Sequence, residues 1–314
     1  MRAFVLEDFG VQPRIADVPM PEVGDEDVLL RVRTSSVNPH ETHVISGAAR
    51  AYMEYRFPVT LGSDVSGIVE EVGRSVTRFA PGDRVFGALR GRVAHRGTYA
   101  DYAALPADCL VWQPPGLDDI DAGSLGLASQ TAVACVDAMG VSRGHIVLIV
   151  GASGGVGSIA IQLLSSAGAK VIATARGSEG ANYVRDLGAV ETVDRANDIA
   201  SIVHAAHPDG IDGVLDLVSS DSLRLTRLAS TVLSDGGSIV STLRAADLEA
   251  LAGVRATNIV TAANPAVLQR VADLVEAGTL RASVSKVFGF EEIAEAISAQ
   301  RSGAHGKVAV RIAP

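Results

Sequence analysis

A short glycine-rich segment constrains the fold of this chain more than any other feature. Residues 151–157 (GASGGVG) lie between an apolar run, Ile146–Val150, and a helical run, Val156–Ala167. A strand, a glycine turn and a helix in this order are typical of a dinucleotide-binding corner, where residues without side chains let the backbone approach a pyrophosphate. The pattern is A-x-G-x-x-G, with Ala152 in the first glycine position. We predict that this turn binds a dinucleotide; the alternative is a structural turn without a ligand.

Strands and helices alternate after residue 120. A helix is predicted from Asp121 to about Met139, and helical stretches separate the strand candidates beyond it. Such alternation predicts a parallel sheet with right-handed crossovers. We therefore expect a doubly wound α/β domain over residues 121–262. Its expected strands are His145–Val150, Lys170–Thr174, Glu191–Val193, Gly213–Leu217, Ser238–Ser241 and Val254–Val260.

The rest of the chain is rich in short strands. Turn formers such as the Pro81-Gly82-Asp83 segment separate the strand candidates of the first third, without helices between them. This pattern predicts an antiparallel or partly barrelled domain over residues 1–120. We expect residues 263–314 to return to that domain. The expected elements are strands Arg2–Leu6, Asp27–Val37, Val65–Val72, Tyr99–Leu105, Val284–Phe288 and Lys307–Arg311, a helix Ala266–Ala277 and a helix from Glu291.

Composition and charge narrow the classes of function. The 314 residues are 47% hydrophobic and 20% charged, which is typical of a compact enzyme and not of a disordered chain. The net charge of −9 gives nucleic-acid binding no electrostatic support. Cys109 and Cys135 are too few for a disulfide framework, and no apolar run approaches the ~18 residues of a membrane helix. We expect a cytoplasmic protein with neither a membrane nor a nucleic-acid partner.

The end of the second expected strand of the α/β domain distinguishes NADP from NAD. NAD enzymes place an acidic residue about twenty residues beyond the glycines, where it binds the ribose 2′-hydroxyl. The stretch Val171–Ser178 has no acidic residue there and carries Arg176 instead. A guanidinium can pair with the 2′-phosphate, assisted by the Ser178 hydroxyl. We therefore predict NADPH as the cofactor; the alternative is that Arg176 is a solvated surface arginine.

Several motifs occur in one order along nearly the whole chain. Besides the glycine turn they are Val37–Thr42 (VNPHET), Leu61–Val69 (LGSDVSGIV), Pro81–Val85 (PGDRV), Gly97–Tyr102 (GTYADY), Ala128–Ala132 (ASQTA) and Gly306–Val308 (GKV). This set resembles zeta-crystallin-like quinone oxidoreductases, zinc-independent members of the medium-chain dehydrogenase/reductase superfamily. The resemblance implies a β-rich, GroES-like catalytic domain and an inserted Rossmann domain, with NADPH and substrate between them.

The chain departs from the zinc alcohol dehydrogenases of that superfamily. Their catalytic zinc takes a Cys in the segment that is Ser35–Asn38 here, and a His where this chain has Ser63. A four-cysteine lobe for a structural zinc is missing as well. Because a zinc site needs at least three protein ligands, we predict no metal site. Without a Lewis acid, reduction of an electrophilic conjugated carbonyl is favoured over alcohol oxidation.

The resemblance assigns roles to several polar residues near the substrate. Asn38 is expected to donate a hydrogen bond to the substrate carbonyl or the cofactor ribose; an Asx-type turn before Pro39 is the alternative. Tyr52 and Tyr55 lie where related reductases carry a substrate-facing tyrosine, and His43 stands where relatives often have one. A phenol or imidazole could protonate the developing enolate, the alternatives being loop packing and protonation by water. The candidate catalytic residues are Asn38, His43 and Tyr52.

Further residues are expected around the cofactor. Thr131 matches a family position beside the nicotinamide, although a helix-interior threonine is the alternative. Val218 and Thr242 follow expected strands whose carboxyl ends form the ligand crevice. The full predicted cofactor set is Asn38, Thr131, Gly151, Ala152, Ser153, Gly154, Gly155, Val156, Gly157, Thr174, Arg176, Ser178, Val218 and Thr242.

These inferences together predict an NADPH-dependent reductase that transfers hydride to a quinone or an α,β-unsaturated carbonyl without zinc. The loops Ser46–Thr60 and Thr242–Leu251 are expected to select the substrate, whose identity stays open. The resemblance further implies a homodimer joined near Val254–Val260. The alternatives are an NADPH-binding sensor or structural protein with little catalysis, and an NAD(P)-linked alcohol dehydrogenase.

Overall fold

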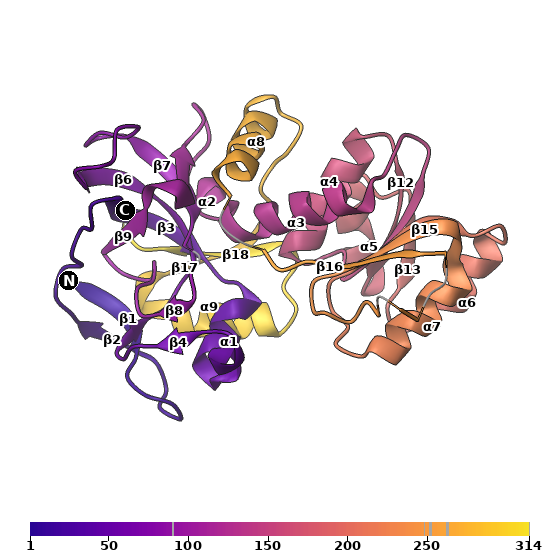
Figure 1. Cartoon of the computed structure of the whole chain (residues 1–314), viewed down its shortest axis with the longest axis horizontal. Helices are drawn as coiled ribbons and strands as arrows, with labels where there is room; N and C mark the ends of the chain where they lie inside the picture. Colours follow the sequence, from indigo (N-terminus) through magenta and orange to yellow (C-terminus); the bar gives the residue numbers. More distant parts are fainter. Residues whose placement is uncertain (90, 248, 251–252, 262–263, 314) are drawn as a thin grey trace. The chain divides into compact units, whose positions relative to one another are not determined.

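A computed structural model describes residues 1–314 except 90, 248, 251–252, 262–263 and 314 (Figure 1). The chain forms two compact units: unit 1 comprises Met1–Gln130 and Ala262–Pro314, and unit 2 comprises Thr131–Thr261. Each unit is described by itself. The predicted boundary between residues 262 and 263 and the last residue of the loop Thr242–Leu251 lie outside the described residues.

Unit 2 is built on a parallel sheet. Its strands lie in the order β13-β12-β11-β14-β15-β16, and every neighbouring pair is parallel. The chain runs outward from β11 first toward β13 and then, on the other side, toward β16, so the order reverses at β11. Ligands of doubly wound sheets bind at the carboxyl ends of strands beside this reversal. The strands are β11 (Ile146–Val150), β12 (Lys170–Ala175), β13 (Glu191–Asp194), β14 (Ile211–Asp216), β15 (Leu233–Ser241) and β16 (Arg255–Asn258).

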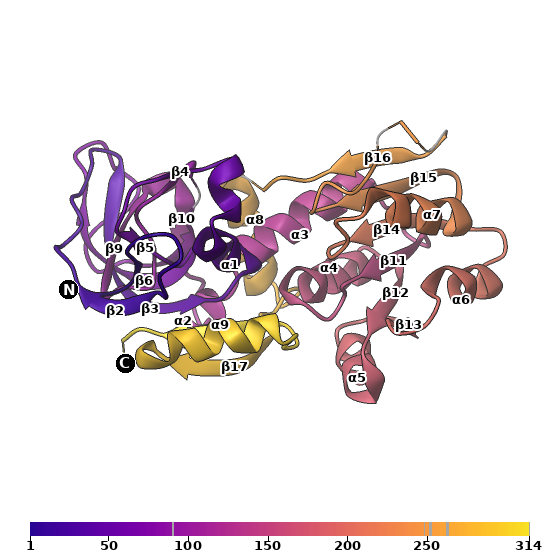
Figure 2. The same ribbon diagram turned by 90° about the horizontal axis from the view of Figure 1, so that it is seen from below.

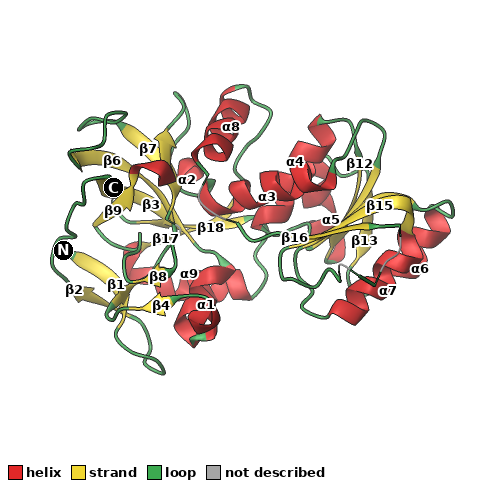
Figure 3. Cartoon of the chain, in the orientation of Figure 1, coloured by secondary structure: helices red, strands yellow, loops and turns green. Residues whose placement is uncertain are grey.

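Helices connect the strands of this sheet (Figure 3). Local sequence fixes where several of them begin. The Asp198 side chain accepts a hydrogen bond from Ser201 N, and the Asp221 side chain accepts one from Arg224 N, so each aspartate caps a helix N-terminus. Apolar residues of the strands and helices form the core, in which Leu148 and Val214 are fully buried. The helices are α4 (Gly155–Ser166), α5 (Gly177–Asp186), α6 (Ile199–Ala206) and α7 (Ser222–Val232).

Unit 1 is rich in β-structure. Its largest sheet has the order β10-β7-β6-β3-β18-β17, and β9 also pairs with β3. Register shifts occur in β3 between Leu29 and Leu30 and between Val32 and Thr34, and such bulges bend a strand locally. Smaller sheets are β2-β1-β5 and β4-β8. The strands are β1 (Arg2–Leu6), β2 (Arg14–Asp17), β3 (Asp27–Ser36), β4 (Glu54–Tyr55), β5 (Val59–Thr60), β6 (Asp64–Val72), β7 (Arg84–Ala88), β8 (Val93–Ala94), β9 (Tyr102–Pro106), β10 (Leu110–Trp112), β17 (Val284–Gly289) and β18 (Lys307–Arg311).

The C-terminal segment completes the large sheet of unit 1 (Figure 2). β18 pairs antiparallel with β3, with Val310 opposite Ser35, while β17 pairs parallel with β18. β3 and β18 therefore lie side by side although the whole of unit 2 separates them in the sequence. The helices that accompany these strands are α1 (Pro39–Ser46), α2 (Asp119–Ala122), α8 (Pro265–Glu276) and α9 (Ile293–Arg301), together with the short turns η1 (Ala48–Ala51), η2 (Ala107–Cys109) and η3 (Phe290–Glu292).

The predicted fold class is confirmed, and one predicted helix is wrong. The helix expected from Asp121 to Met139 is broken into α2, which ends at Ala122, and α3 (Gly126–Met139). Two glycines at the break pack too closely for a side chain, because a Cβ at Gly123 would lie 2.8 Å from Thr34 O and one at Gly126 would lie 2.2 Å from Gly87 O. None of the described helices is long and apolar enough to cross a membrane.

The central strand of unit 2 offers a test of this packing. Leu148 is fully buried in β11, so Leu148→Ala is expected to lower the free energy of unfolding by about 2–5 kcal/mol through lost burial and a residual cavity. Leu223→Ala is the control, because Leu223 is 72% exposed and its truncation should change stability by less than about 0.5 kcal/mol. Urea denaturation followed by circular dichroism measures both; equal effects would contradict the placement of Leu148.

Candidate functional site

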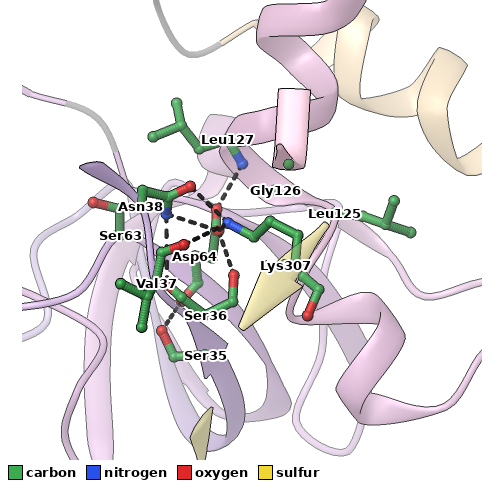
Figure 4. Close-up of polar contacts among 12 residues, drawn as sticks. Ser35, Ser36, Val37, Asn38, Ser63, Asp64, Leu125, Gly126, Leu127 and Lys307 are labelled. Carbon is green, nitrogen blue, oxygen red and sulfur yellow. Dashed lines mark hydrogen bonds and ion pairs between the residues drawn. The ribbon is translucent and has the colours of Figure 1, made fainter. Parts of the chain in front are cut away.

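A buried carboxylate lies at the centre of a polar cluster in unit 1 (Figure 4). Asp64 begins β6 and is fully buried. Its Oδ2 atom accepts hydrogen bonds from Ser36 Oγ at 2.6 Å, Asn38 Nδ2 at 2.9 Å and Lys307 Nζ at 3.0 Å. Its Oδ1 atom accepts one from Leu127 N at 2.6 Å. Because a buried charge is costly unless it is paired and hydrogen-bonded, these donors stabilise Asp64 in the fold.

The positive partner of Asp64 comes from the other end of the chain. Lys307 is the first residue of β18 and is 4% exposed. Its Nζ atom donates to Val37 O at 3.0 Å, Asn38 Oδ1 at 2.7 Å and Asp64 Oδ2 at 3.0 Å. An ammonium group has three N–H donors, and these contacts use all of them. Lys307 therefore holds its neighbours in place and has no donor left for a ligand.

Asn38 lies between this ion pair and the start of α1. It is 5% exposed and is the N-cap residue of the helix that begins at Pro39. An ammonium group can only donate, so the oxygen of the Asn38 amide must face Lys307, and the nitrogen then faces Asp64. One amide hydrogen bonds to Asp64, while the other makes a long 3.5 Å contact with Ser36 O. The side chain is thus a fixed donor with one weakly used hydrogen.

A second buried carboxylate adjoins this cluster. Glu41 is 1% exposed; its Oε2 atom accepts from Asn38 N at 2.6 Å and its Oε1 atom accepts from Ser63 Oγ at 2.9 Å. Burial, followed by the nearby negative charge of Asp64, raises the pKa of Glu41 from 4.5 to about 7, although Lys307 and the two hydrogen bonds act in the opposite direction. Glu41 therefore changes its charge near neutral pH inside unit 1.

Glu41 and Ser63 line a pocket within unit 1. About 450 Å³ of space, part of it open to solvent, lies between α1, the residues before β6 and the segment around β8. His40 and Arg96 add polar groups to the wall. Most of the remaining lining is apolar and includes Val44, Met53, Val59, Leu61, Leu89 and Val93. An apolar hollow with a few polar groups is typical of a small-molecule site.

The other predicted catalytic residues take no part in the Asp64 cluster. His43 is exposed in the last turn of α1, and Tyr52 is 52% exposed just after η1. The hydroxyl of Tyr55 donates to Val44 O at 3.0 Å, and its ring lies 4.8 Å from that of Phe9. Of the predicted catalytic side chains, Asn38 is therefore the one that joins the buried polar cluster.

Sequence reasoning missed Glu41, Ser63, Asp64 and Lys307 as site residues, although the motifs contained all of them. A signal was present, since Asp64 and Lys307 each stand at the edge of a run of strand-forming, mostly apolar residues. A charge in such a run is unusual unless it has a partner. Their pairing could not be inferred, because it depends on β18 lying beside β3.

The glycine turn in unit 2 has the shape expected of a phosphate-binding corner. Gly151 has a φ of +88°, and its N–H donates to Thr174 Oγ1 at 3.0 Å, so Thr174 holds the turn. A Cβ at Gly157 would lie 2.5 Å from Ala152 O, whereas a Cβ at Gly154 would come no closer than 3.5 Å to Gly151 O. Gly157 thus permits close packing of α4, and Gly154, the N-cap of that helix, leaves open space in front of the turn.

The residues after β12 are arranged around an aspartate that the sequence analysis overlooked. Arg176 and Ser178 are exposed. Asp194, at the end of the neighbouring strand β13, accepts from Gly177 N at 3.0 Å and from Ala196 N at 2.9 Å. These backbone donors, Ala196 first, lower the pKa of Asp194, and the charge of Arg176 adds a smaller effect. The Asp194 carboxylate is thus engaged with the backbone beside the exposed Arg176.

Of the remaining predicted cofactor contacts, Val218 and Thr242 follow the carboxyl ends of β14 and β15, and Thr131 lies in α3. The fully buried Asp216 accepts from Val218 N at 2.9 Å and from Ser219 Oγ at 2.6 Å, which organises the turn after β14. Thr242 N donates to Asp216 O at 3.2 Å. The hydroxyl of Thr131 lies 2.8 Å from that of Thr261. Val218 is 56% exposed and is available for contact with a ligand.

The residues of unit 1 do not fit a catalytic zinc ion. Among the residues that the structure describes, no three His, Cys, Asp or Glu side chains gather as a metal site would require. Where zinc alcohol dehydrogenases carry ligands, this chain has the hydroxyl of Ser63 and the Ser35–Asn38 segment. The ammonium of Lys307 lies 3.0 Å from Asp64 Oδ2, so a cation is already bound to that carboxylate.

Comparison with known proteins identifies the class to which this fold and site belong. Residues 24–115 match the family model of the alcohol dehydrogenase GroES-like domain, and residues 187–310 match that of the zinc-binding dehydrogenases. The chain belongs to the medium-chain dehydrogenase/reductase family and has quinone oxidoreductases among its relatives. Quinone oxidoreductase of Sus scrofa is 36% identical over 228 residues, which cover 72% of this chain and 67% of that protein.

Two further relatives extend the comparison. The chloroplastic NADPH-dependent alkenal/one oxidoreductase of Arabidopsis thaliana is 29% identical over 322 residues, covering 99% of this chain and 79% of that protein. Among solved structures, an NAD-dependent alcohol dehydrogenase superposes with a TM-score of 0.88 at 28% identity, and the match covers all of both chains. The family therefore includes relatives named for different cofactors and substrates.

The buried ion pair leads to a test of stability. Lys307→Met leaves the charge of Asp64 without its partner, so we expect a loss of about 3–5 kcal/mol in the free energy of unfolding. Lys286→Met on the neighbouring strand β17 is the control, because Lys286 is exposed and its loss should change stability by less than about 0.5 kcal/mol. Urea denaturation measures the free energy of unfolding of both variants. Similar small losses in the two would mean that the Asp64–Lys307 pair is unimportant to the fold.

The raised pKa of Glu41 predicts a pH dependence of stability. The folded state keeps the proton up to about pH 7, whereas the unfolded chain releases it near 4.5, so this contribution to stability is complete below 4.5 and is lost as the pH rises through 7. Glu41→Gln stays neutral, so we expect it to be more stable than the wild type by up to about 3 kcal/mol above this window and equally stable below it.

Denaturation curves at pH values across the window measure this difference. Glu71→Gln, at an exposed position of β6, is the matched control and should show no such trend. A constant difference between Glu41→Gln and the wild type would contradict the titration of Glu41.

Proposed function

We propose that this protein uses NADPH to reduce a quinone or an α,β-unsaturated carbonyl compound without a metal ion. The names of the relatives support this class, since one is a quinone oxidoreductase and another an NADPH-dependent alkenal/one oxidoreductase. The observation that carries the proposal is the fixed amide of Asn38 in unit 1. When bound, the cofactor supplies a hydride to the substrate.

Asn38 suits the stabilisation of charge that develops on a substrate oxygen. Lys307 holds the amide oxygen and Asp64 holds one amide hydrogen, so the group needs no reorganisation when a ligand binds. A preorganised donor aimed at developing charge is an effective form of electrostatic catalysis. The second amide hydrogen of Asn38 is the donor that we assign to the substrate carbonyl.

The residues at the positions of the family's zinc ligands support the choice of reaction. Oxidation of an unactivated alcohol gains much from a metal that lowers the pKa of the hydroxyl, and at the positions of the zinc ligands this chain has Ser63 and the Ser35–Asn38 segment. A conjugated carbonyl is already electrophilic and needs chiefly orientation and a hydrogen-bond donor. The site therefore favours reduction of an activated double bond or a quinone.

The residues after β12 support NADPH as the cofactor. Arg176 is exposed, and Ser178 follows it at the start of α5. Asp194, whose carboxylate interacts electrostatically with Arg176, already accepts two backbone N–H groups, so the Arg176 guanidinium can pair with a 2′-phosphate. The glycine turn at residues 151–157 would hold the pyrophosphate, with Val218 and Thr242 at the adjacent strand ends.

The domains, location and oligomeric state of the protein are also proposed. We assign residues 1–120 and 263–314 to a catalytic domain and residues 121–262 to the cofactor domain. We further propose a cytoplasmic homodimer joined along β16 and the residues that follow it. Size-exclusion chromatography with light scattering gives the mass in solution, and a monomer would reject the dimer.

The proposed reaction is tested by following NADPH and NADH oxidation with a panel of quinones and enones, with and without a chelator. Turnover with NADPH that the chelator does not change supports the proposal. Binding of NADPH without turnover on any compound would favour a sensor, and oxidation of alcohols with NAD would favour an alcohol dehydrogenase. Either result overturns the proposed reaction.

Arg176 offers a sharper test of the cofactor. Arg176→Ala removes a charge-assisted pair with the 2′-phosphate, so we expect the KM for NADPH to rise about 10- to 100-fold while the KM for NADH stays the same. Arg224→Ala, an exposed arginine on α7, is the control and should change neither value. An equal effect of Arg176→Ala on both cofactors would reject a contact with the 2′-phosphate.

A further inference from the structure

The hydrogen bonds of Glu41 determine where it can carry a proton. Its Oε2 atom accepts the backbone N–H of Asn38 at 2.6 Å, and a backbone amide can only donate. A proton on Oε2 would therefore face another hydrogen at close range. Oε1 lies 2.9 Å from Ser63 Oγ, and a hydroxyl can either donate or accept. A protonated Glu41 thus carries its hydrogen on Oε1 and donates it to Ser63.

Protonation of Glu41 changes what Ser63 can do. While Glu41 is a carboxylate, the Ser63 hydroxyl donates to it. Once Oε1 carries the proton and becomes the donor, the hydrogen of Ser63 is free to turn toward another acceptor. Ser63 and Glu41 both line the pocket of unit 1, so that acceptor would be a molecule bound there.

We propose that Glu41 and Ser63 form a proton relay that delivers the second hydrogen of the reduction to the substrate. The relay rests on the proposed function. With NADPH as the hydride donor, the β-carbon of an enone would gain a C–H bond, and the electron pair of the double bond would move toward the carbonyl. The α-carbon then takes the Ser63 proton as Ser63 takes the proton of Glu41 Oε1, leaving a carboxylate. For a quinone, an oxygen of the reduced ring is the acceptor.

The electrostatic surroundings of Glu41 suit a group that is reprotonated after each turnover. Burial contributes most to the raised pKa of Glu41, and the negative charge of Asp64 raises it further, whereas the ammonium of Lys307 lowers it. The resulting pKa of about 7 leaves both forms of Glu41 populated near neutral pH. Solvent that enters the pocket can return the proton.

Other titratable groups also face this region. Tyr99 is fully buried, and its hydroxyl donates to Ser36 O at 3.3 Å; burial, then the charges of Glu41 and Asp64, raise its pKa well above the usual value. Tyr99 therefore stays neutral when Glu41 titrates. The guanidinium of Arg96 is paired with Asp27 at 2.7 Å, and His40 lines the same pocket.

Glu41 also stabilises the start of α1, so the test must separate a proton relay from a structural role. Glu41→Gln retains that role: its amide oxygen can accept from Asn38 N and its amide nitrogen can donate to Ser63, as the protonated acid does. Ser63→Ala removes the final donor. Ser66→Ala is the matched control, because Ser66 is buried in β6, the strand that follows Ser63, and its hydroxyl donates to Asp119 O, away from Glu41.

The first measurement needs no turnover. Difference infrared spectroscopy of the cofactor-free protein follows the carboxylic acid C=O stretch as the pH is raised. We expect a band that disappears as the pH passes through about 7 and that is absent in Glu41→Gln. If the wild type and Glu41→Gln show the same bands in this region, the relay is overturned, whatever the enzyme reduces.

The second measurement uses NADPH and a cyclic enone with a methyl group on its α-carbon, in deuterated water. We expect the wild type to place deuterium on one face of that carbon and to lose activity as the pH rises above about 7. Glu41→Gln and Ser63→Ala should lower kcat about 100-fold and lose the facial preference, as general acid catalysis predicts. The kcat and facial preference of Ser66→Ala should match those of the wild type.

The outcomes separate the relay from the function on which it rests. An active wild type whose Glu41→Gln and Ser63→Ala variants keep its rate and its facial preference overturns the relay alone. If the wild type fails to oxidise NADPH with every quinone and enone of the panel, both the relay and the proposed function are overturned. Loss of rate with an unchanged facial preference would also reject Ser63 as the proton donor.

Discussion

The ion pair between Asp64 and Lys307 is the interaction on which the rest of unit 1 depends. It joins the start of β6 to the start of β18, and both side chains are almost completely buried. Two buried charges are tolerated only when their hydrogen-bonding capacity is satisfied, and here Ser36, Asn38 and the backbone provide the partners. The pair is therefore better understood as a device for positioning the Asn38 amide than as a source of net stability.

The same pair sets the electrostatic environment of Glu41. Burial raises the pKa of Glu41 most, the charge of Asp64 raises it further and the charge of Lys307 lowers it, so the pKa lies at about 7. Stability and chemistry then make opposite demands on this residue. The carboxylate costs stability above neutral pH, whereas a group that exchanges protons near the working pH is well suited to acid–base chemistry. Conflicts of this kind are common at functional sites.

Local patterns in the sequence predicted the strand, turn and helix around residues 151–157, because the signal lies within twenty residues. The same holds for the parallel sheet, whose strands differ from the predicted ones only at their ends. The break before Gly126 could not be predicted, since the residues packed against it, Gly87 and Asp64, are distant in the sequence. Likewise, Lys307 was visible as a charge in a strand, but its partner Asp64 lies 243 residues away.

The position of β18 has a consequence for the synthesis of the protein. β3 leaves the ribosome well before its sheet neighbour β18, because the whole of unit 2 is synthesised between them. Until then the Thr34–Ser36 end of β3 lacks its partner strand, although β9 can already pair with Asp27–Arg31, and the carboxylate of Asp64 has no ammonium partner. Domains fold in order as they emerge, so unit 2 can finish while unit 1 waits. The nascent chain thus passes through a state with an exposed strand edge, where assistance from a chaperone would matter most.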